Sequence, residues 1–241
     1  MSENNTTSAP RLLLFGGTGS VGSAIFRRFH SGGWKVVVVS RTKGDGEDRL
    51  QWDPIAIVQD LDTHEQLAAT GPFDAVCWAQ GLNLNDSVYD FDCCRHEAAY
   101  GANVLYILKS LNVLLARNLL RSPARLCVIS SIWQNLARQT KLSYCVTKAA
   151  LEGLVLSAAA DLARDGHVIN AVLPGVLDTP MTRANLNPEQ VHKVERATLF
   201  GRLPQLDEVA SCVYGLCRPE MSAVTGQFIS VDLGYSRVRV I

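Results

Sequence analysis

The chain has 241 residues, of which 47% are hydrophobic and 19% are charged. This composition excludes a disordered or collagen-like chain, and a chain of this length buries about three quarters of its unfolded surface in one core. We therefore predict one domain over residues 11–241, with no separate substrate domain. The 23 Lys and Arg balance the 23 Asp and Glu. No net field attracts nucleic acid or an anionic membrane, and we expect neither as a partner.

The N-terminal residues 1–10, MSENNTTSAP, are polar and contain no basic residue. They predict a disordered tail rather than a signal or transit peptide. No window holds the roughly 18 consecutive apolar residues that a membrane span needs, so we expect a cytoplasmic protein. The seven Cys are odd in number and include no C-x-x-C pair. This argues against a disulfide framework and a zinc site, and we expect no metal.

Predicted strands and helices alternate along the chain. A strand over residues 11–15 leads through a glycine turn into a helix over residues 23–30. Further strands are predicted over residues 35–39, 73–79, 125–130, 167–173 and 227–231, and long helices over residues 99–120 and 144–164. The strands are continuous apolar runs, which indicates burial on both faces. The predicted fold class is therefore α/β: a Rossmann-type doubly wound parallel sheet with helices on both faces.

Two of the predicted helical segments are apolar nearly all round. Residues 104–120 carry only Lys109 and Arg117 as charges, and residues 149–163 carry only two acids. A helix of this kind is buried on more than one side, either deep within the monomer or at a subunit interface. The interface reading predicts a homo-oligomer, a dimer or a tetramer.

A glycine-rich turn joins the first strand to the first helix. Its sequence, Gly17-Thr18-Gly19-Ser20-Val21-Gly22, fits the pattern G-x-G-x-x-G. Glycines at these positions permit a tight turn, let a pyrophosphate approach the backbone and allow close helix packing, while free N–H groups at the helix start face the anion. A turn without a ligand is the alternative, but the position between strand and helix favours a dinucleotide site.

The second strand ends in Ser40 and Arg41, where a protein that binds NAD usually carries an acid for the ribose hydroxyls. A guanidinium at this point pairs with a 2′-phosphate, which favours NADP(H) as the cofactor. The alternative is a solvated surface arginine. Because the third strand is not assigned, either Asp53 or Asp60 is a candidate neighbour of the adenine.

A serine, a tyrosine and a lysine form the strongest candidate for catalysis. Tyr144 and Lys148 are four positions apart at the start of a helix, so their side chains share one face. A cation beside a phenol, whose ordinary pKa is about 10, favours the phenolate and moves the pKa toward neutrality. Ser131 ends the preceding strand, where its hydroxyl would hold a substrate carbonyl oxygen. Each residue alone is also compatible with plain packing or surface roles.

Together these features resemble the short-chain dehydrogenase/reductase family, in its single-domain branch of about this length. The family's site combines a glycine-rich turn, an Asn in the fourth helix, a Ser after the fifth strand and Y-x-x-x-K. Asn103, Ser131, Tyr144 and Lys148 match those residues. The family's P-G turn and following Thr near the nicotinamide are matched by Pro174-Gly175-Val176 and Thr179. The resemblance extends from about residue 11 to residue 234.

The resemblance implies a role for each matched residue. Tyr144 is expected to donate a proton to the substrate carbonyl oxygen as hydride arrives from the nicotinamide, and Ser131 to hydrogen-bond that oxygen. Lys148 is expected to lower the pKa of the tyrosine and to bind the nicotinamide ribose. Asn103 would connect Lys148 to solvent through its main chain and a water, and residues 174–176 would orient the carboxamide.

Two segments depart from the family pattern. The glycine segment is one residue shorter than the usual T-G-x-x-x-G-x-G, and the usual N-N-A-G after the fourth strand is replaced by Trp78-Ala79-Gln80-Gly81. Ala79 and Gly81 are expected to contact the cofactor from this segment. The catalytic residues are all present, so the resemblance implies a divergent but active member.

The family places its variable substrate lid after the P-G turn, which corresponds to residues 181–203 here. A second wall follows the serine. Candidate pocket residues on these two segments and beside them are Trp133, Gln134, Leu136, Leu177 and Met181. Three basic residues of the lid, Arg183, Lys193 and Arg196, are candidates for an acidic or carrier-bound substrate, with surface solvation as the alternative.

The leading hypothesis is a reductase that uses NADPH to convert a small carbonyl substrate, free or carrier-bound, to an alcohol. An alcohol dehydrogenase working in the oxidative direction is the second hypothesis, and Arg41 argues against it because NADPH generally serves reduction. A cofactor-binding regulator without chemistry is a third. Loss of Tyr144 or Lys148 would favour that reading, and both residues are present.

Overall fold

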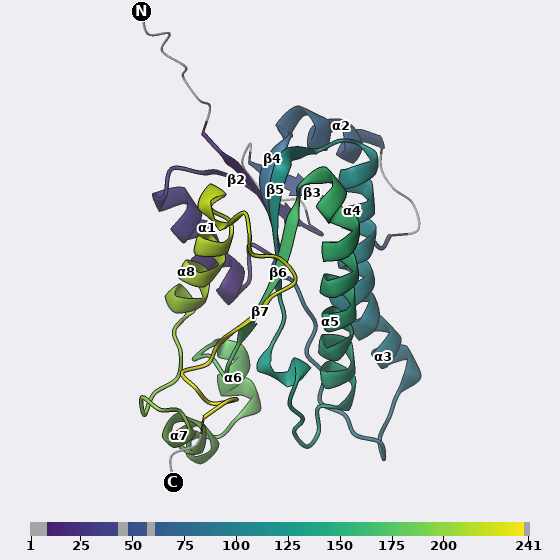
Figure 1. Cartoon of the computed structure of the whole chain (residues 1–241). Coiled ribbons are helices and arrows are strands. Elements are labelled where there is room, and N and C mark those ends of the chain that lie inside the picture. Colours follow the sequence, from purple (N-terminus) through teal and green to yellow (C-terminus); the bar gives the residue numbers. More distant parts are fainter. Residues whose placement is uncertain (1–8, 43–47, 57–60, 239–241) are drawn as a thin grey trace, which may run out of the picture.

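A seven-stranded, entirely parallel sheet forms the centre of the protein (Figure 1), in the order β3-β2-β1-β4-β5-β6-β7. The computed structural model describes residues 9–42, 48–56 and 61–238, apart from the side chains of residues 61–64, 181 and 185. The predicted tail therefore lies almost wholly outside the described residues. The strands are β1 (Arg11–Phe15), β2 (Lys35–Ser40), β3 (Arg49–Gln51), β4 (Phe73–Trp78), β5 (Leu120–Ile129), β6 (Val168–Pro174) and β7 (Phe228–Val231).

Helices cover both faces of this sheet, as Figure 1 shows. On one face lie α1 (Ser20–Ser31) and α8 (Leu206–Leu216), which pack against each other. On the other lie α2 (Leu61–Thr70), α3 (Cys93–Tyr100), α4 (Tyr106–Ala116) and α5 (Leu142–Leu162). Two short helices, α6 (Pro180–Asn185) and α7 (Pro188–Ala197), lie beyond the end of the sheet. The α/β doubly wound fold that the sequence predicts is confirmed.

Successive residues of each strand enter two different cores. Leu12 and Leu14 pack with α1 and α8, whereas Leu13 and Phe15 pack with the helices of the opposite face. All four are fully buried. This explains why the strands read as continuous apolar runs, because a strand between two layers of helices has no solvent face.

The predicted helix over residues 99–120 is wrong at its C-terminal end. Helix α4 ends at Ala116, and Leu120 is the first residue of β5. The backbone leaves the helix at Asn118, which has a φ of 53°, and Leu119 N–H closes the turn on Leu114 O at 2.9 Å. Asn accepts this left-handed conformation more readily than other residues with a side chain, so hydrophobicity alone overextends the helix.

The helical stretch Cys93–Ala116, which joins α3 and α4, is the one among the described residues that is long and apolar enough to cross a membrane by length and composition. Nearly half of its most apolar window, 44%, is buried inside the protein. Its buried residues Tyr106, Ile107, Leu111 and Leu114 belong to the core beneath the sheet. Packing on the sheet therefore accounts for its composition.

Candidate active site

The principal cleft opens where the carboxyl ends of the strands meet, and its volume is about 740 Å³. It spans the point where the sheet order reverses, between β1 and β4, which is where doubly wound folds bind their ligands. Most of the predicted site residues line it: Thr18, Gly19, Ser20, Val21, Ser40, Arg41, Ala79, Gly81, Ser131, Trp133, Tyr144, Lys148, Pro174, Gly175, Val176, Leu177 and Thr179. Residues far apart in the sequence thus form one cleft.

Several predicted residues lie outside the lining of this cleft. Asp53 follows β3 and accepts a hydrogen bond from Ile55 N–H at 3.2 Å, and Ile55, not Asp53, lines the cleft. Gln134 is buried and its Oε1 accepts from Ser130 Oγ at 2.8 Å, so it supports the cleft wall from behind. Gly17, Gly22, Asn103 and Leu136 also do not line the cleft. Asp60 and the side chain of Met181 lie outside the described residues.

The glycine turn is shaped so that side chains have no room at two positions. Gly16 has a φ of +73°, and a Cβ there would lie 2.6 Å from the backbone nitrogen of Gln80. A Cβ on Gly22 would lie 2.1 Å from Gly16 O. The start of α1 therefore packs directly on the turn that precedes it. The helix N-terminus points its free N–H groups into the cleft end lined by Thr18, Gly19 and Ser20.

Gln80, in the segment that departs from the family pattern, lines the same end of the cleft. Its side-chain Nε2 and Oε1 are both buried and make no hydrogen bond with the described part of the chain. Buried amides are almost always hydrogen-bonded, so this pair of atoms fits a ligand group that both donates and accepts. A cofactor hydroxyl in the cleft meets that requirement.

Tyr144 lies in the first turn of α5, beside the end of β5. Ser131 caps the short helical turn Ile132–Gln134 that follows β5, and its hydroxyl is near enough to the phenol of Tyr144 to influence its pKa. On the opposite side, Lys148 Nζ lies 5.7 Å from the centroid of the Tyr144 ring. The serine, tyrosine and lysine that the sequence singles out are therefore neighbours in the cleft.

The pKa of Tyr144 differs from the sequence-based expectation. Burial raises it to about 12, because the phenolate loses water, and the hydroxyl of Ser131 only partly opposes this. The predicted lowering of the pKa toward neutrality by Lys148 is therefore wrong, because burial of the phenol has the larger effect. The consequence is a phenol that keeps its proton throughout the neutral range.

Lys148 is 4% exposed, and its Nζ donates to the carbonyl oxygen of Ile129 at 3.0 Å. Burial lowers its pKa from the ordinary value of 10.5 to about 8. At neutral pH the side chain is still charged, but it titrates within two units of that pH. Because this pKa lies close to neutral pH, an anion placed beside Lys148 would raise it and increase the fraction of the side chain that is charged.

Asn103 connects three parts of the cleft wall. It lies in a turn of π-helix, Gly101–Leu105, between α3 and α4. Its Nδ2 donates to Leu82 O at 2.9 Å and to Thr147 Oγ1 at 2.8 Å, and its Oδ1 accepts from Leu82 N–H at 2.7 Å. The side chain therefore fixes the segment after β4 against α5, one residue before Lys148. This leaves the main chain of Asn103 for the relay role that the family resemblance implies.

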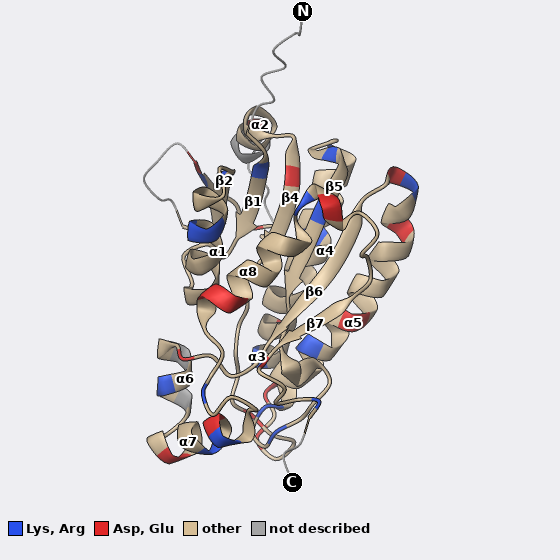
Figure 2. Cartoon of the chain, turned by 60° about the vertical axis from the view of Figure 1, so that its left-hand side comes forward, with Lys and Arg blue, Asp and Glu red and all other residues tan. Residues whose placement is uncertain are grey.

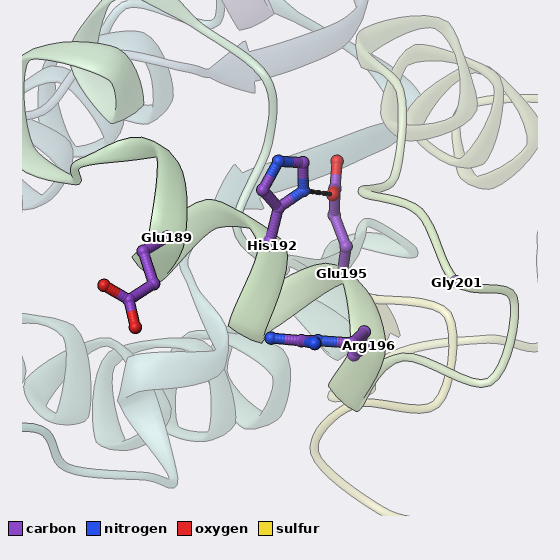
Figure 3. Close-up of a pocket in the computed structure, with 5 residues that line it drawn as sticks. All are labelled: Glu189, His192, Glu195, Arg196 and Gly201. Atoms are coloured by element: carbon purple, nitrogen blue, oxygen red, sulfur yellow. Dashed lines mark hydrogen bonds and ion pairs between the residues drawn. The ribbon is translucent and has the colours of Figure 1, made fainter.

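The predicted lid contains α6 and α7, and its basic residues lie outside the cleft lining. Arg183 forms a two-point ion pair with Asp178, at 2.8 and 2.9 Å. Figure 3 shows a shallow second hollow on α7, lined by Glu189, His192, Glu195, Arg196 and Gly201, in which the His192 ring lies 2.8 Å from Glu195 and Glu189 points away. No group of three or more metal-binding side chains occurs among the residues that the structure describes.

Sequence reasoning missed two cations of the cleft, Arg138 and Lys141. Both lie in the segment between Ser131 and Tyr144, which contains no Asp or Glu. That local excess of positive charge, so close to the predicted catalytic residues, is the signal that would have identified them.

Comparison with known proteins agrees with this geometry. Residues 82–236 match the family model described as "Enoyl-(Acyl carrier protein) reductase". Together with the fold and the site, this match identifies the class of protein as an oxidoreductase with a dinucleotide-binding fold. The chain belongs to the short-chain dehydrogenase/reductase family.

Characterised relatives align over nearly the whole chain. A tropinone reductase homolog of Datura stramonium is 27% identical, over 93% of this chain and 91% of its own length. The L-xylulose reductase of Bos taurus is also 27% identical, over 93% of this chain and 96% of its own length. An acetoacetyl-CoA reductase of Synechocystis is 27% identical over 92% and 94%.

Solved structures share the fold. The aldohexose dehydrogenase of Thermoplasma acidophilum superimposes with a TM-score of 0.86 at 22% identity, over 97% of this chain and 96% of its own. A gluconate 5-dehydrogenase from Burkholderia cenocepacia, solved with NADP and tartrate, also gives a TM-score of 0.86 at 22% identity, over 96% and 97%. At this identity the likeness establishes the architecture.

Proposed function

We propose that the protein is an NADPH-dependent reductase that converts a ketone to an alcohol, with Tyr144 as the general acid. The observation that carries this proposal is the arrangement of Ser131, Tyr144 and Lys148 in the cleft beside the glycine turn. Two of the relatives, a tropinone reductase homolog and an L-xylulose reductase, support the same reaction class.

The cleft fits a dinucleotide on three counts. The close packing at Gly16 and Gly22 shapes the turn, and Gly19 lines the cleft at the helix N-terminus, where a pyrophosphate would approach. Gln80 offers an unused buried amide, and Arg41 lies exposed at the end of β2. An exposed guanidinium at that position favours a 2′-phosphate, so we propose NADP(H) rather than NAD(H).

The nicotinamide of the bound cofactor would supply the hydride to the substrate carbonyl carbon. The protein's residues then act on the carbonyl oxygen. Ser131 donates a hydrogen bond to that oxygen, and Tyr144 transfers its phenolic proton to it. The positive charge of Lys148 stabilises the phenolate that remains. Pro174, Gly175 and Val176 line the cleft where the carboxamide would be oriented.

The raised pKa of Tyr144 supports its proposed role as a proton donor. Reduction requires a phenol that gives a proton, whereas oxidation requires a phenolate that accepts one. A pKa of about 12 keeps Tyr144 protonated at neutral pH. The resting protein therefore already holds the proton that the reductive direction consumes.

A panel of ketones tests the proposed function. Purified protein is mixed with NADPH, and the loss of nicotinamide absorbance is followed with each ketone and without one. We expect consumption that depends on the ketone and that is at least tenfold slower with NADH at equal concentration. Oxidation of alcohols with NADP⁺ at neutral pH serves as the comparison. Faster oxidation than reduction across the panel would contradict the proposal.

A further inference from the structure

The charge of the cleft is one-sided. Four cations line it, Arg41, Arg138, Lys141 and Lys148, and none of its described lining residues is Asp or Glu. The whole chain is neutral, with 23 basic and 23 acidic residues, and charges of both signs are interspersed along the elements in Figure 2. The described cleft lining is therefore positively charged, and the acidic residues that make the whole chain neutral lie outside it.

Two of these cations belong to the proposed cofactor site, and two remain. Arg41 ends β2 and Lys148 lies beside the phenol, as described above. Arg138 and Lys141 come from the segment between β5 and α5 that joins Ser131 to Tyr144. Lys141 Nζ lies 5.8 Å from the Tyr144 ring centroid. This second pair of cations is thus adjacent to the reacting groups.

Lys141 is held in place by the protein itself. It is 4% exposed, and its Nζ donates to Asn83 Oδ1 at 2.7 Å, to Leu84 O at 3.3 Å and to Asn85 Oδ1. Three acceptors use all three N–H groups of an ammonium. Its charge acts on the cleft, but no donor remains for a direct hydrogen bond to a substrate.

Arg138 differs from two arginines of the predicted lid in having no carboxylate partner among the described residues. Arg183 and Arg202 are each paired with a carboxylate, Asp178 and Glu208 respectively. Arg138 is half-buried, lines the cleft, and forms no ion pair or side-chain hydrogen bond with any residue that the structure describes. Its positive charge acts on Lys141, a like charge, and lowers the pKa of that ammonium. Two adjacent cations, one of them with its donors free, form a site for an anion.

We propose that the substrate is an anionic carbonyl compound, whose carboxylate or phosphate binds the guanidinium of Arg138 while its carbonyl faces Ser131 and Tyr144. This inference rests on the proposed reductase function and adds its substrate class. The anion cancels the repulsion between Arg138 and Lys141. The fork of Arg138 supplies two parallel donors, which match the geometry of a carboxylate.

Matched pairs of substrates test the proposal. The probes are 5-oxohexanoate and its methyl ester, with the shorter 4-oxopentanoate and its ester as a second pair, and dihydroxyacetone phosphate against dihydroxyacetone as the phosphate pair. We expect kcat/KM to be about 10- to 100-fold higher for the anionic member of at least one pair, the contribution of a charge-assisted hydrogen bond. A preference confined to the phosphate pair identifies phosphate as the source of the anion.

Variants of Arg138 assign the effect to this residue. Arg138→Gln should reduce the preference for the anion about tenfold or more, and Arg138→Lys should restore part of it. Arg164→Gln is the matched control, because Arg164 is 85% exposed and pairs with Asp165 after the far end of α5. That control should leave the ratio unchanged. Equal losses for acid and ester in Arg138→Gln would overturn the proposal.

A binding measurement separates this inference from the proposed reaction. Hexanoate has the carboxylate of 5-oxohexanoate but no carbonyl, so it binds without reacting. Titration calorimetry on the protein without cofactor should show hexanoate binding that weakens about tenfold in Arg138→Gln. If no ketone is reduced but hexanoate binds through Arg138, the anion site stands and the reductase function fails. Hexanoate binding that is identical in both proteins would refute the anion site.

Discussion

Lys148 determines how the proposed reaction depends on pH. Its pKa is lowered by burial to about 8, whereas that of Tyr144 is raised by burial to about 12. As pH rises from neutrality, Lys148 is therefore the first of the two to lose its proton. Tyr144 keeps its own proton, but the positive charge that would stabilise the phenolate left after proton transfer is lost.

We accordingly predict that kcat/KM for ketone reduction falls as pH rises through about 8, since this parameter reports the free enzyme's pKa values. Steady-state rates between about pH 6 and 10 measure the fall. In Lys148→Arg the guanidinium stays charged over this whole range, so any residual activity should lose the decline. The same decline at the same pH in Lys148→Arg would show that another group is responsible.

Arg41 is the residue that we propose sets the cofactor preference. It lies at the end of β2, where an acid would instead favour NAD(H). We predict that Arg41→Ala weakens NADPH binding about 10- to 100-fold and NADH binding by less than about threefold, because only NADPH carries the 2′-phosphate. Fluorescence titration of the bound nicotinamide gives both constants. Equal weakening of the two cofactors would refute the phosphate contact.

The sequence identifies the reacting residues more readily than their pKa values. Ser131, Tyr144 and Lys148 carry a recognisable spacing, so they are predictable from the chain alone. The direction of the Tyr144 shift depends on how much water the fold removes from the phenol, and spacing contains no information on burial. Arg138 is similar: its free guanidinium becomes visible only when neighbouring carboxylates have been placed.

At the scale of elements, the turn between β1 and α1 is the most constrained part of the site. A Cβ on Gly22 would lie 2.1 Å from Gly16 O, whereas one on Gly19 would lie at an ordinary 3.5 Å from the same atom. The two glycines therefore differ in purpose. Gly22 lets the helix pack on the turn, and Gly19 lines the cleft where the cofactor approaches.

Alanine substitutions separate these purposes. Gly22→Ala should lower the free energy of unfolding by about 1–3 kcal/mol, because the clash requires the helix to shift. Gly19→Ala should change it by less than about 0.5 kcal/mol while still weakening NADPH binding. Urea unfolding gives the first quantity and fluorescence titration the second. A Gly22→Ala protein as stable as Gly19→Ala would mean that the helix does not pack on the turn as described.

The boundaries of elements are less predictable than their existence. All the predicted strands occur, because buried parallel strands are continuous apolar runs. The end of α4 is set by the left-handed backbone at Asn118, and the short strand β3 has only three residues. Neither feature produces an apolar pattern. The third strand therefore becomes identifiable only from its pairing with β2.

At the scale of the whole molecule, the apolar faces of α4 and α5 indicate where two copies of the chain would make contact. Each helix buries one side in the core. On the other side, Leu105 just before α4 is 39% exposed and Leu108 in α4 is 43% exposed. In α5, Val146 and Leu156 are 44% and 49% exposed. The first alternative from sequence, burial within the monomer, holds for one side of each helix, and the subunit interface stays a prediction. One side of each helix is core, and the other is an apolar surface of the kind that mediates subunit contacts.

We predict that the protein forms a homo-oligomer through this surface. Light scattering should give a mass that is two or four times the chain's 26.3 kDa. Leu108→Glu combined with Leu156→Glu should shift the mass toward one chain, since a buried unpaired charge is costly. Val88→Glu, which alters a 70% exposed apolar residue that belongs to neither helix, is the control. A monomeric wild-type protein would contradict the prediction.

The central claim for the whole molecule is that one sheet brings the cofactor turn, the acid and the anion site into a single cleft, with Tyr144 as the proton donor. The most direct test is a single measurement of NADPH oxidation by Tyr144→Phe with the best ketone of the panel. Phenylalanine keeps the ring and removes only the acidic hydroxyl. We predict a loss in kcat of about 10²- to 10⁴-fold with NADPH affinity unchanged within about twofold. Normal turnover by Tyr144→Phe would contradict the account.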